Sequence, residues 1–363
     1  MKTFIKQHKL LTSIITIFTL ILLILAFATI FIFAKLSKLN YHDGTLTTEQ
    51  QGLLNIDQST FEATTSEDDT ATEEALISSE EAGTLAETEV ILAEGDVYSD
   101  DDIFNILLLG TDERSANFST NARADSIMIL SLNKKANTMK LVSLQRGMGF
   151  PILEGTYKGQ YDWITHLFRY GGADLMLRSV REVLHVDVEH YVRVNFHTFE
   201  QLIDSVGGVD VELTATEVSG LNGEVRTNAR TRVKVTEGVN HLDGYDALQY
   251  SRLRYTDSDW KRIQRQRNVL QSVVTNAKGM NLLEINSMLD TVLPLVQTNL
   301  TSTDILGLVG YAPAVLGMEM KQMTIPASGT YGSMTGLGGR TLYAVDFKTN
   351  SELLHEFLYG SEF

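Results

Sequence analysis

The first apolar pattern in the chain is a long uncharged run near its start. Residues 10–34 consist mainly of Leu, Ile, Phe and Ala and contain no charged side chain. At about 1.5 Å per residue, a helix of this length exceeds the roughly 30 Å hydrocarbon thickness of a bilayer. A cleaved signal peptide is the alternative, but its apolar region is usually shorter, and the candidate cleavage motif Ala26-Phe27-Ala28 lies inside the run. The pattern predicts one uncleaved transmembrane helix.

Lysines flank this span unevenly. Three precede it and two follow it, after which a long stretch has no basic residue. Because cytoplasmic loops carry an excess of Lys and Arg, residues 1–9 are predicted to be a cytoplasmic tail. The rest of the chain is then expected outside the cell membrane, as the extracellular part of a single-pass protein.

An acidic, polar stretch follows the span. Residues 39–102 hold 18 of the 46 acidic residues and no Lys or Arg, which leaves 28 acidic against 30 basic residues elsewhere. Such a composition buries too little apolar surface to offset the entropy of ordering. Residues 35–101 are therefore predicted to be a disordered, self-repelling tether. The acidity belongs to this stretch, and no extended basic face favours a nucleic-acid partner.

Short apolar runs separated by turns begin at Ile103. Strand-like runs alternate with helical ones, which predicts a central mixed sheet covered by helices on both faces, an α/β/α sandwich, over residues 102–363. The expected strands are 103–109, 126–132, 139–144, 190–194 and 209–213, and the expected helices are 175–184 and 199–206. The hydrophobic fraction of 43% is enough to fill such a core.

Several classes of site are disfavoured by residue type. The chain has no cysteine, which excludes disulfides, thiolate metal sites and cysteine nucleophiles. Its histidines have no metal-ligand spacing, and it has neither a phosphate-binding P-loop nor a G-x-S-x-G elbow. Any metal ion would have to be held mainly by oxygen atoms.

A basic cluster lies on a late helix that Ser258 can cap. Projection at 100° per residue puts Arg262 and Gln266 on the same face as the apolar residues, so both are expected to point inward. Arg252 and Arg254 would point the same way if their segment is extended. A buried arginine needs an anion, and the alternative is a set of structural ion pairs and solvated side chains.

Two aspartates lie at neighbouring strand ends. Asp112 follows the first strand and Asp125 precedes the second. If the strands are antiparallel neighbours, both carboxylates meet at one edge, where they could bind Mg²⁺ or titrate as a coupled pair. Strand-end aspartates are more often turn formers. Together with inward arginines, however, they predict a site for a pyrophosphate.

Six segments together resemble the LytR-CpsA-Psr family of cell-wall proteins. They are NILLLGTDER (105–114), RADSIMI (123–129), LVSLQR (141–146), VGGVDV (206–211), LDGYDALQYSRLR (242–254) and DWKRIQRQ (259–266). The resemblance covers residues 103–278, in consistent order. It implies a Gram-positive phosphotransferase that moves a glycopolymer from an undecaprenyl-pyrophosphate carrier to peptidoglycan through a phosphodiester.

The resemblance also implies roles for individual residues. Asp112 and Asp125 would hold Mg²⁺, and Arg252 and Asp259 would belong to the catalytic set with them. The residues expected on the phosphates are Arg114, Arg123, Arg146, Arg252, Arg254, Arg262 and Gln266. An apolar pocket would take the polyprenyl chain.

The sequence departs from the family pattern at two positions. Gly147 stands where the family usually has Asp, and Trp163 stands where it usually has Lys. Both departures remove a charge near the expected site. A non-catalytic envelope regulator of the same fold that binds polyprenyl phosphates is therefore the alternative function.

Overall fold

A seven-stranded mixed sheet forms the centre of the protein. The computed structural model describes residues 34–42, 77, 84–119, 122–224, 234–253 and 258–360. In spatial order the strands are β1 (Asn40–Tyr41), β10 (Gln297–Thr298), β7 (His190–Val194), β2 (Ile103–Thr111), β3 (Ala124–Asn133), β4 (Thr138–Leu144) and β11 (Met320–Ile325). Strand β3 is antiparallel to β2 and β4, whereas β7 is parallel to β2. The predicted mixed sheet is confirmed.

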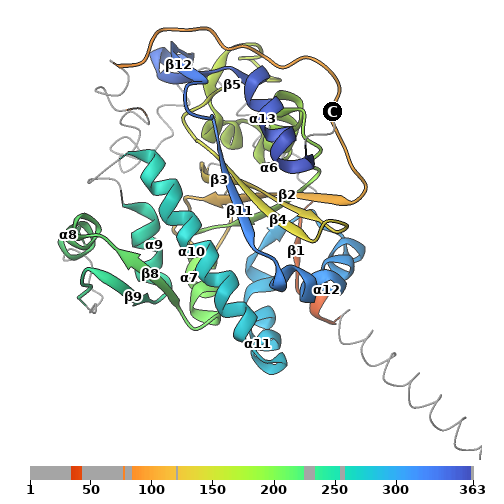
Figure 1. The fold of residues 1–363 in the computed structure, drawn as a ribbon, viewed down its shortest axis with the longest axis vertical. Coiled ribbons are helices and arrows are strands. Elements are labelled where there is room, and N and C mark those ends of the chain that lie inside the picture. Colours follow the sequence, from red (N-terminus) through yellow and green to blue (C-terminus); the bar gives the residue numbers. More distant parts are fainter. Residues whose placement is uncertain are drawn as a thin grey trace, which may run out of the picture.

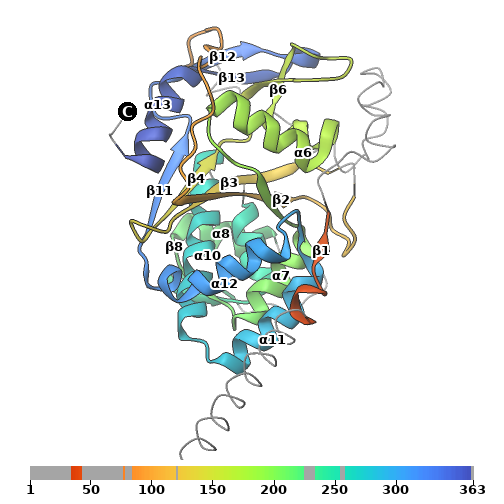
Figure 2. The ribbon, with the colours of Figure 1, turned by 90° about the vertical axis from the view of Figure 1, so that its right-hand side faces the viewer.

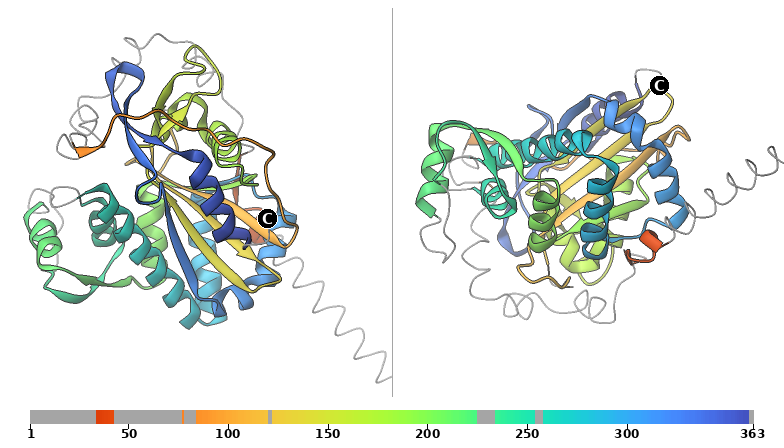
Figure 3. Two further views of the ribbon diagram at one scale, coloured as in Figure 1. Left: turned by 45° about the horizontal axis from the view of Figure 1, so that its top comes forward. Right: turned by 90° about the horizontal axis from the view of Figure 1, so that it is seen from below.

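Helices cover both faces of this sheet (Figure 1). Helices α6 (Ile164–Leu184) and α13 (Phe347–Tyr359) lie on one face, and α7 (Phe196–Ser205), α10 (Asp259–Gly279), α11 (Leu282–Val292) and α12 (Ser302–Gly317) lie on the other (Figures 2 and 3). Alternate β3 residues serve the two layers: Ile127 and Ile129 join the core under α6 and α13, while Met128 packs toward α10 and α12. This period of two is what a strand buried on both faces requires.

Smaller elements surround the three layers. Three two-stranded sheets pair β5 (Gly149–Pro151) with β6 (Tyr161–Trp163), β8 (Val209–Leu213) with β9 (Gly238–Leu242), and β12 (Tyr331–Thr335) with β13 (Thr341–Val345). The remaining elements are α8 (Ala215–Glu224), α9 (Gly244–Arg252) and the 3-10 turns η2 (Leu293–Leu295) and η3 (Leu337–Gly339). The strand predicted at 209–213 exists as β8, but it lies outside the central sheet.

Helix α6 begins well before the predicted start at Leu175. Its first half, from Ile164 to Tyr170, is separated from the second by a kink at Gly171 and Gly172. Gly172 has φ of +62°, a conformation that side chains with a Cβ rarely adopt. The two glycines thus mark a bend within one largely buried helix.

The segment around Arg252 is also different from the prediction. The shared direction of Arg252 and Arg254 required an extended segment, but residues up to Arg252 form helix α9, where the Asp243 side chain accepts a capping hydrogen bond from the Asp246 backbone N–H. Ser258 does occupy the N-cap of α10 as predicted. Its hydroxyl makes no capping hydrogen bond, however, and its carbonyl accepts from the Lys261 N–H at 3.0 Å.

Part of the predicted tether packs on the domain, so the boundary at residue 101 is wrong. The Thr88 N–H donates to the Ser333 carbonyl at 3.0 Å, and the Tyr98 N–H donates to the His185 carbonyl at 3.0 Å. Backbone pairing with strands supplies the enthalpy that the polar side chains of this stretch lack. Most of residues 43–83 lie outside the described residues.

No helix within the described ranges is long and apolar enough to cross a membrane. The predicted span at 10–34, apart from Ala34, and the tail at 1–9 lie outside those ranges. The anchor, its orientation and the extracellular location therefore stay predictions.

Candidate functional site

Asp112 and Asp125 lie at the same edge of the central sheet. The pairing of β2 with β3 places Thr111 opposite Ala124, so Asp112 lies one residue beyond this pair, and Asp125 is the second residue of β3, next to a register shift between the strands. The Asp112 carboxylate accepts hydrogen bonds from the Arg123 backbone N–H and Nε, both at 2.9 Å. Burial, reinforced by the nearby charge of Asp125, raises the pKa of Asp112 even though Arg123 opposes the shift. The expected meeting of the two carboxylates is observed.

A second set of ion pairs joins β4 to the start of α10. Arg146, just after β4, lies 2.7 Å from Asp125 Oδ1 through Nη1, and its Nη2 is 3.1 Å from Asp259 Oδ1. Arg262 Nη2 approaches the same oxygen at 3.1 Å and donates to the Asp125 carbonyl at 3.0 Å. Burial lowers the pKa of Arg146, but Asp259 and Asp125 together outweigh that effect and raise it. Acidic and basic side chains therefore alternate across the edge.

Gln145 completes this network, although it had no expected role within the LVSLQR segment. Its amide Nε2 donates to Asp259 Oδ2 at 3.2 Å, and its Oε1 accepts from the Gly147 N–H. The Gly147 carbonyl accepts from the Tyr343 N–H at 3.0 Å. The family pattern has a carboxylate at position 147. Here the Gly147 backbone instead connects the site to β13 through these two hydrogen bonds.

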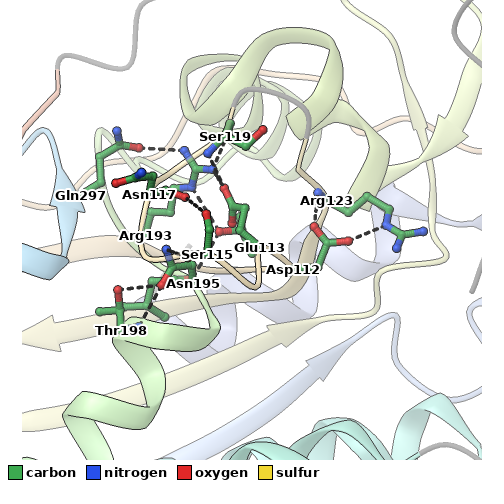
Figure 4. Close-up of polar contacts among 12 residues, drawn as sticks. Asp112, Glu113, Ser115, Asn117, Ser119, Arg123, Arg193, Asn195, Thr198 and Gln297 are labelled. Carbon is green, nitrogen blue, oxygen red and sulfur yellow. Dashed lines mark hydrogen bonds and ion pairs between the residues drawn. The ribbon is translucent and has the colours of Figure 1, made fainter. Parts of the chain in front are cut away.

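A buried guanidinium from β7 holds the loop that carries Asp112 (Figure 4). Arg193 donates to Glu113 and, at 2.7 Å, to the Ser119 carbonyl, while its Nη1 donates to Gln297 on β10 at 2.9 Å. Its Nε donates to the Thr111 hydroxyl at 3.2 Å. Sequence reasoning missed Arg193, because a single arginine in an apolar strand does not reveal its partner.

Two aromatic rings enclose this guanidinium. The Arg193 carbon Cζ lies 4.6 Å from the centre of the Phe118 ring and 4.5 Å from that of Phe168. Burial lowers the pKa of Arg193, partly offset by Glu113. The ion pair, the rings and the backbone contacts together hold residues 112–119 in a defined position beside the two aspartates.

The remaining residues predicted to bind phosphate are Arg252, Arg114, Gln266 and Arg254. Arg252 ends α9 with its guanidinium 4.4 Å from the Phe196 ring centre, and the Phe196 N–H donates to the Glu113 carbonyl. Arg252 therefore borders the Asp112 loop. Arg114 is exposed on that loop, and Gln266 is half-buried on α10, one turn after Arg262. Arg254 lies outside the described residues.

The alternative reading of the basic cluster holds for two other arginines of α10. Arg265 pairs with Glu217 at 3.4 Å and donates to the Leu253 carbonyl at 2.6 Å. Arg267 donates to the Ser143 hydroxyl at 2.8 Å, and burial lowers its pKa to about 10. Both therefore make structural contacts, and both are buried rather than solvated.

The side chain of Trp163 contacts the segment around residue 340. Its indole N–H donates to the Thr341 carbonyl at 2.9 Å, and the Arg340 guanidinium lies 5.6 Å from its ring centre. The neighbouring Asp162 is fully buried and accepts hydrogen bonds from His166 at 3.0 Å and the Tyr170 hydroxyl at 2.5 Å. The position at which the family pattern has a lysine is thus next to a packed, buried polar cluster.

The donor set at the edge suits one divalent cation bound jointly with a ligand. Among the described residues, no group of three or more His, Cys, Asp or Glu side chains could enclose a metal ion. Asp112 and Asp125 offer two carboxylates whose mutual repulsion a cation would relieve. Mg²⁺ is commonly held by one or two carboxylates together with substrate phosphates. The residues present fit that mode of binding.

Comparison with known proteins finds a matching family model, relatives and solved structures. The model of the LytR_cpsA_psr family matches residues 54–356. A Bacillus subtilis protein, "Polyisoprenyl-teichoic acid--peptidoglycan teichoic acid transferase TagT", is 32% identical over 61% of this chain and 68% of its own length. A Bacillus cereus relative named as the corresponding transferase TagU is 35% identical over 54% of this chain and 60% of its own length. A solved structure of TagT bound to LIIa-WTA is 25% identical, with a TM-score of 0.58 over 75% of this chain and 99% of the other.

Proposed function

Because this chain belongs to the LytR-CpsA-Psr family, we propose that it transfers a glycopolymer from a polyprenyl-pyrophosphate carrier to peptidoglycan. The observation that carries the proposal is the alternation of Asp112, Asp125 and Asp259 with arginine side chains at one edge of the sheet. The arginine side chains at such an edge can neutralise the negative charge of a diphosphate and the charge that develops on it during transfer. The relatives named as teichoic acid transferases support the reaction type.

The carboxylates position the guanidinium groups for this task. Arg123 is held by Asp112, and Arg146 and Arg262 share one oxygen of Asp259. Preorganised donors need little rearrangement when charge develops on the phosphate oxygens. We assign these three arginines, with Arg252 at the border of the loop, to the pyrophosphate.

The reaction exchanges one bond to phosphorus for another. A sugar hydroxyl of peptidoglycan loses its proton to a base as its oxygen attacks the phosphorus atom that carries the glycopolymer. The bond to the bridging oxygen breaks, and polyprenyl phosphate leaves. Mg²⁺ held by Asp112 and Asp125 would neutralise charge on the pyrophosphate. Within the chain, Arg146 and Arg262 would hold the phosphate oxygens in line for the attack.

The location of the protein is part of the same proposal. Residues 10–34 would anchor the chain in the membrane that contains the lipid carrier, with the domain on the outer side. The undecaprenyl carrier, the peptidoglycan acceptor and the bilayer are then the partners, and no nucleic acid is needed.

The test is transfer by the full-length protein in vesicles. Lipid-linked glycopolymer and peptidoglycan fragments are supplied with and without Mg²⁺, and phosphodiester-linked product is measured. Asp125→Asn and Arg252→Ala should lose transfer while retaining the thermal unfolding of the parent protein. Glu352→Gln, which changes an exposed carboxylate on α13, is the matched control and should keep transfer.

A non-catalytic regulator that binds polyprenyl phosphates is the second candidate. The missing carboxylate at Gly147 and the tryptophan at position 163 favour it. In that case Asp125→Asn in the cell would leave the wall content of glycopolymer unchanged, although the purified protein would still bind polyprenyl phosphate. Loss of attached polymer in the same variant would exclude it.

A further inference from the structure

The residues that directly follow the predicted membrane span are docked on the folded domain. Strand β1 pairs in parallel with β10, which makes it the edge strand of the central sheet. The His42 N–H donates to the Thr298 carbonyl at 2.9 Å, and the His42 carbonyl accepts from the Tyr191 hydroxyl at 3.0 Å. Leu36 is only 7% exposed. Burial and backbone pairing together hold residues 34–42 in place.

Ion pairs fix the same segment to α11. Lys35 and Lys38 each approach a different oxygen of Asp290 at 2.5 Å. Their hydrogen bonds lower the pKa of the Asp290 carboxyl. Exposed ion pairs contribute little to stability on their own. Their effect here is on orientation, since they align the start of the segment with the outer face of α11.

The chain also returns to the domain after the acidic stretch. Ile77 is 1% exposed and belongs to the main core, and the Ser333 N–H donates to the Ala86 carbonyl at 2.9 Å. The chain is therefore in contact with the domain both at His42, before most of the acidic stretch, and at Ile77 within it. The acidic stretch does not separate the domain from the residues that follow the span.

Exposed apolar side chains lie beside the docked segment. Tyr41 is 57% exposed and Leu283, in the first turn of α11, is 81% exposed. Leu283 and Asp290 are seven residues apart, so they lie on one face of the helix. Figure 2 shows residues 34–41 and α11 together at one end of the molecule. We call the surface formed by Lys35, Lys38, Tyr41, Leu283 and Asp290 the juxtamembrane face.

We propose that the juxtamembrane face rests on the lipid bilayer, so that the domain is fixed at the membrane surface rather than suspended on a tether. The inference rests on the anchor proposed at residues 10–34, whose last residue, Ala34, immediately precedes Lys35. A flexible coil from residue 35 to 101 would let the domain move about 40–50 Å from the membrane. Docking of residues 34–42 removes that freedom.

Lipid is the occupant that the chemistry of this face fits. The two lysines outnumber Asp290, so the face keeps a net positive charge that attracts anionic headgroups, while tyrosine and leucine side chains suit the boundary between headgroups and acyl chains. The face begins where the apolar span ends. A protein partner would have to compete with the bilayer for this position.

Quenching by labelled lipid tests the proposal. Because the chain has no cysteine, Leu283→Cys can carry a fluorophore at a single site in the full-length protein. Vesicles of phosphatidylethanolamine and phosphatidylglycerol with nitroxide-labelled lipid are the probe. The matched control is Ile91→Cys, another exposed apolar position, which lies beside Asp346 at the start of α13. Quenching several-fold stronger at 283 than at 91 is expected, and equal or absent quenching would overturn the proposal.

Two insertions separate docking from tethering. A flexible Gly-Ser segment placed after residue 60 should leave quenching at position 283 unchanged, because the acidic stretch is not the spacer. The same segment placed between Ala34 and Lys35 should abolish quenching by lifting the domain. If the insertion after residue 60 abolished quenching and the insertion before Lys35 did not, the acidic stretch would determine the distance between the domain and the bilayer.

Cross-linking tests the docked contact itself. Mild oxidation of the Asn40→Cys/Gln297→Cys protein in vesicles should form a disulfide, because these residues are Cα partners in the pairing of β1 with β10, whereas Asn40→Cys with Glu352→Cys on α13 should not. Failure of the first pair would refute docking. None of these measurements needs transferase activity. A chain that does not sediment with vesicles would refute the anchor and with it this proposal, whatever the transfer assay gives.

Discussion

The ion pair between Arg193 and Glu113 provides a sharp test of how the Asp112 loop is positioned. The side chains are 5% and 7% exposed, and the second Glu113 oxygen, Oε2, is buried without a hydrogen-bond partner. In Arg193→Met the remaining carboxylate would be buried without its counter-ion. Breaking a buried pair in this way costs about 3–5 kcal/mol.

The loss should be visible in thermal unfolding of the full-length protein in detergent. At about 2–4 °C per kcal/mol for a domain of this size, the midpoint should fall by roughly 6–20 °C. The Glu113→Gln/Arg193→Met protein should recover part of that loss, because removing both charges relieves the unpaired carboxylate. Arg193→Lys keeps the charge but cannot reach Thr111, Gln297 and Ser119 together.

The same variants connect stability to the site. Since Arg193 holds residues 112–119, the Mg²⁺ concentration needed for transfer should rise in Arg193→Lys at a temperature where the protein is still folded. The reasoning is refuted if Arg193→Met lowers the unfolding free energy by less than about 1 kcal/mol, or if the double variant is no more stable than Arg193→Met.

Further predictions concern buried carboxylates. Because burial and Asp125 raise the pKa of Asp112, folding favours its protonated form, and stability should fall as pH rises from the ordinary value of 3.8 through the raised one. Asp112→Asn should therefore unfold at higher temperature than the parent protein at neutral pH while losing transfer. Unfolding midpoints equal to those of the parent protein at every pH would contradict this. Burial opposes ionisation of Asp162, but His166, Arg340 and the Tyr170 hydroxyl outweigh it and lower its pKa, so its contribution is present above pH 3.8 and lost as pH falls below that value. Tyr170→Phe should cost about 1.5–3 kcal/mol and move acid unfolding to higher pH, and an unchanged acid midpoint would count against this account.

The sequence by itself determined the three central strands and placed Asp112 and Asp125 near their ends. Short, nearly continuous apolar runs give β2, β3 and β4, because a strand buried on both faces presents apolar side chains to two layers whatever its neighbours are. Given that β2 and β3 are adjacent, Asp112 and Asp125 had to meet at one edge. The inward direction of Arg262 followed from helical spacing on α10 for the same local reason.

Only the tertiary structure decided which distant side chains meet. Arg193 and Glu113 are 80 residues apart, and Lys38 and Asp290 are 252 apart, so no periodicity links them. Composition placed residues 84–101 in a tether, whereas backbone hydrogen bonds to β12 and β13 place part of them on the domain. Patterning encodes whether a residue faces a core. It does not encode the partner, since pairing depends on packed layers and on the desolvation that packing imposes.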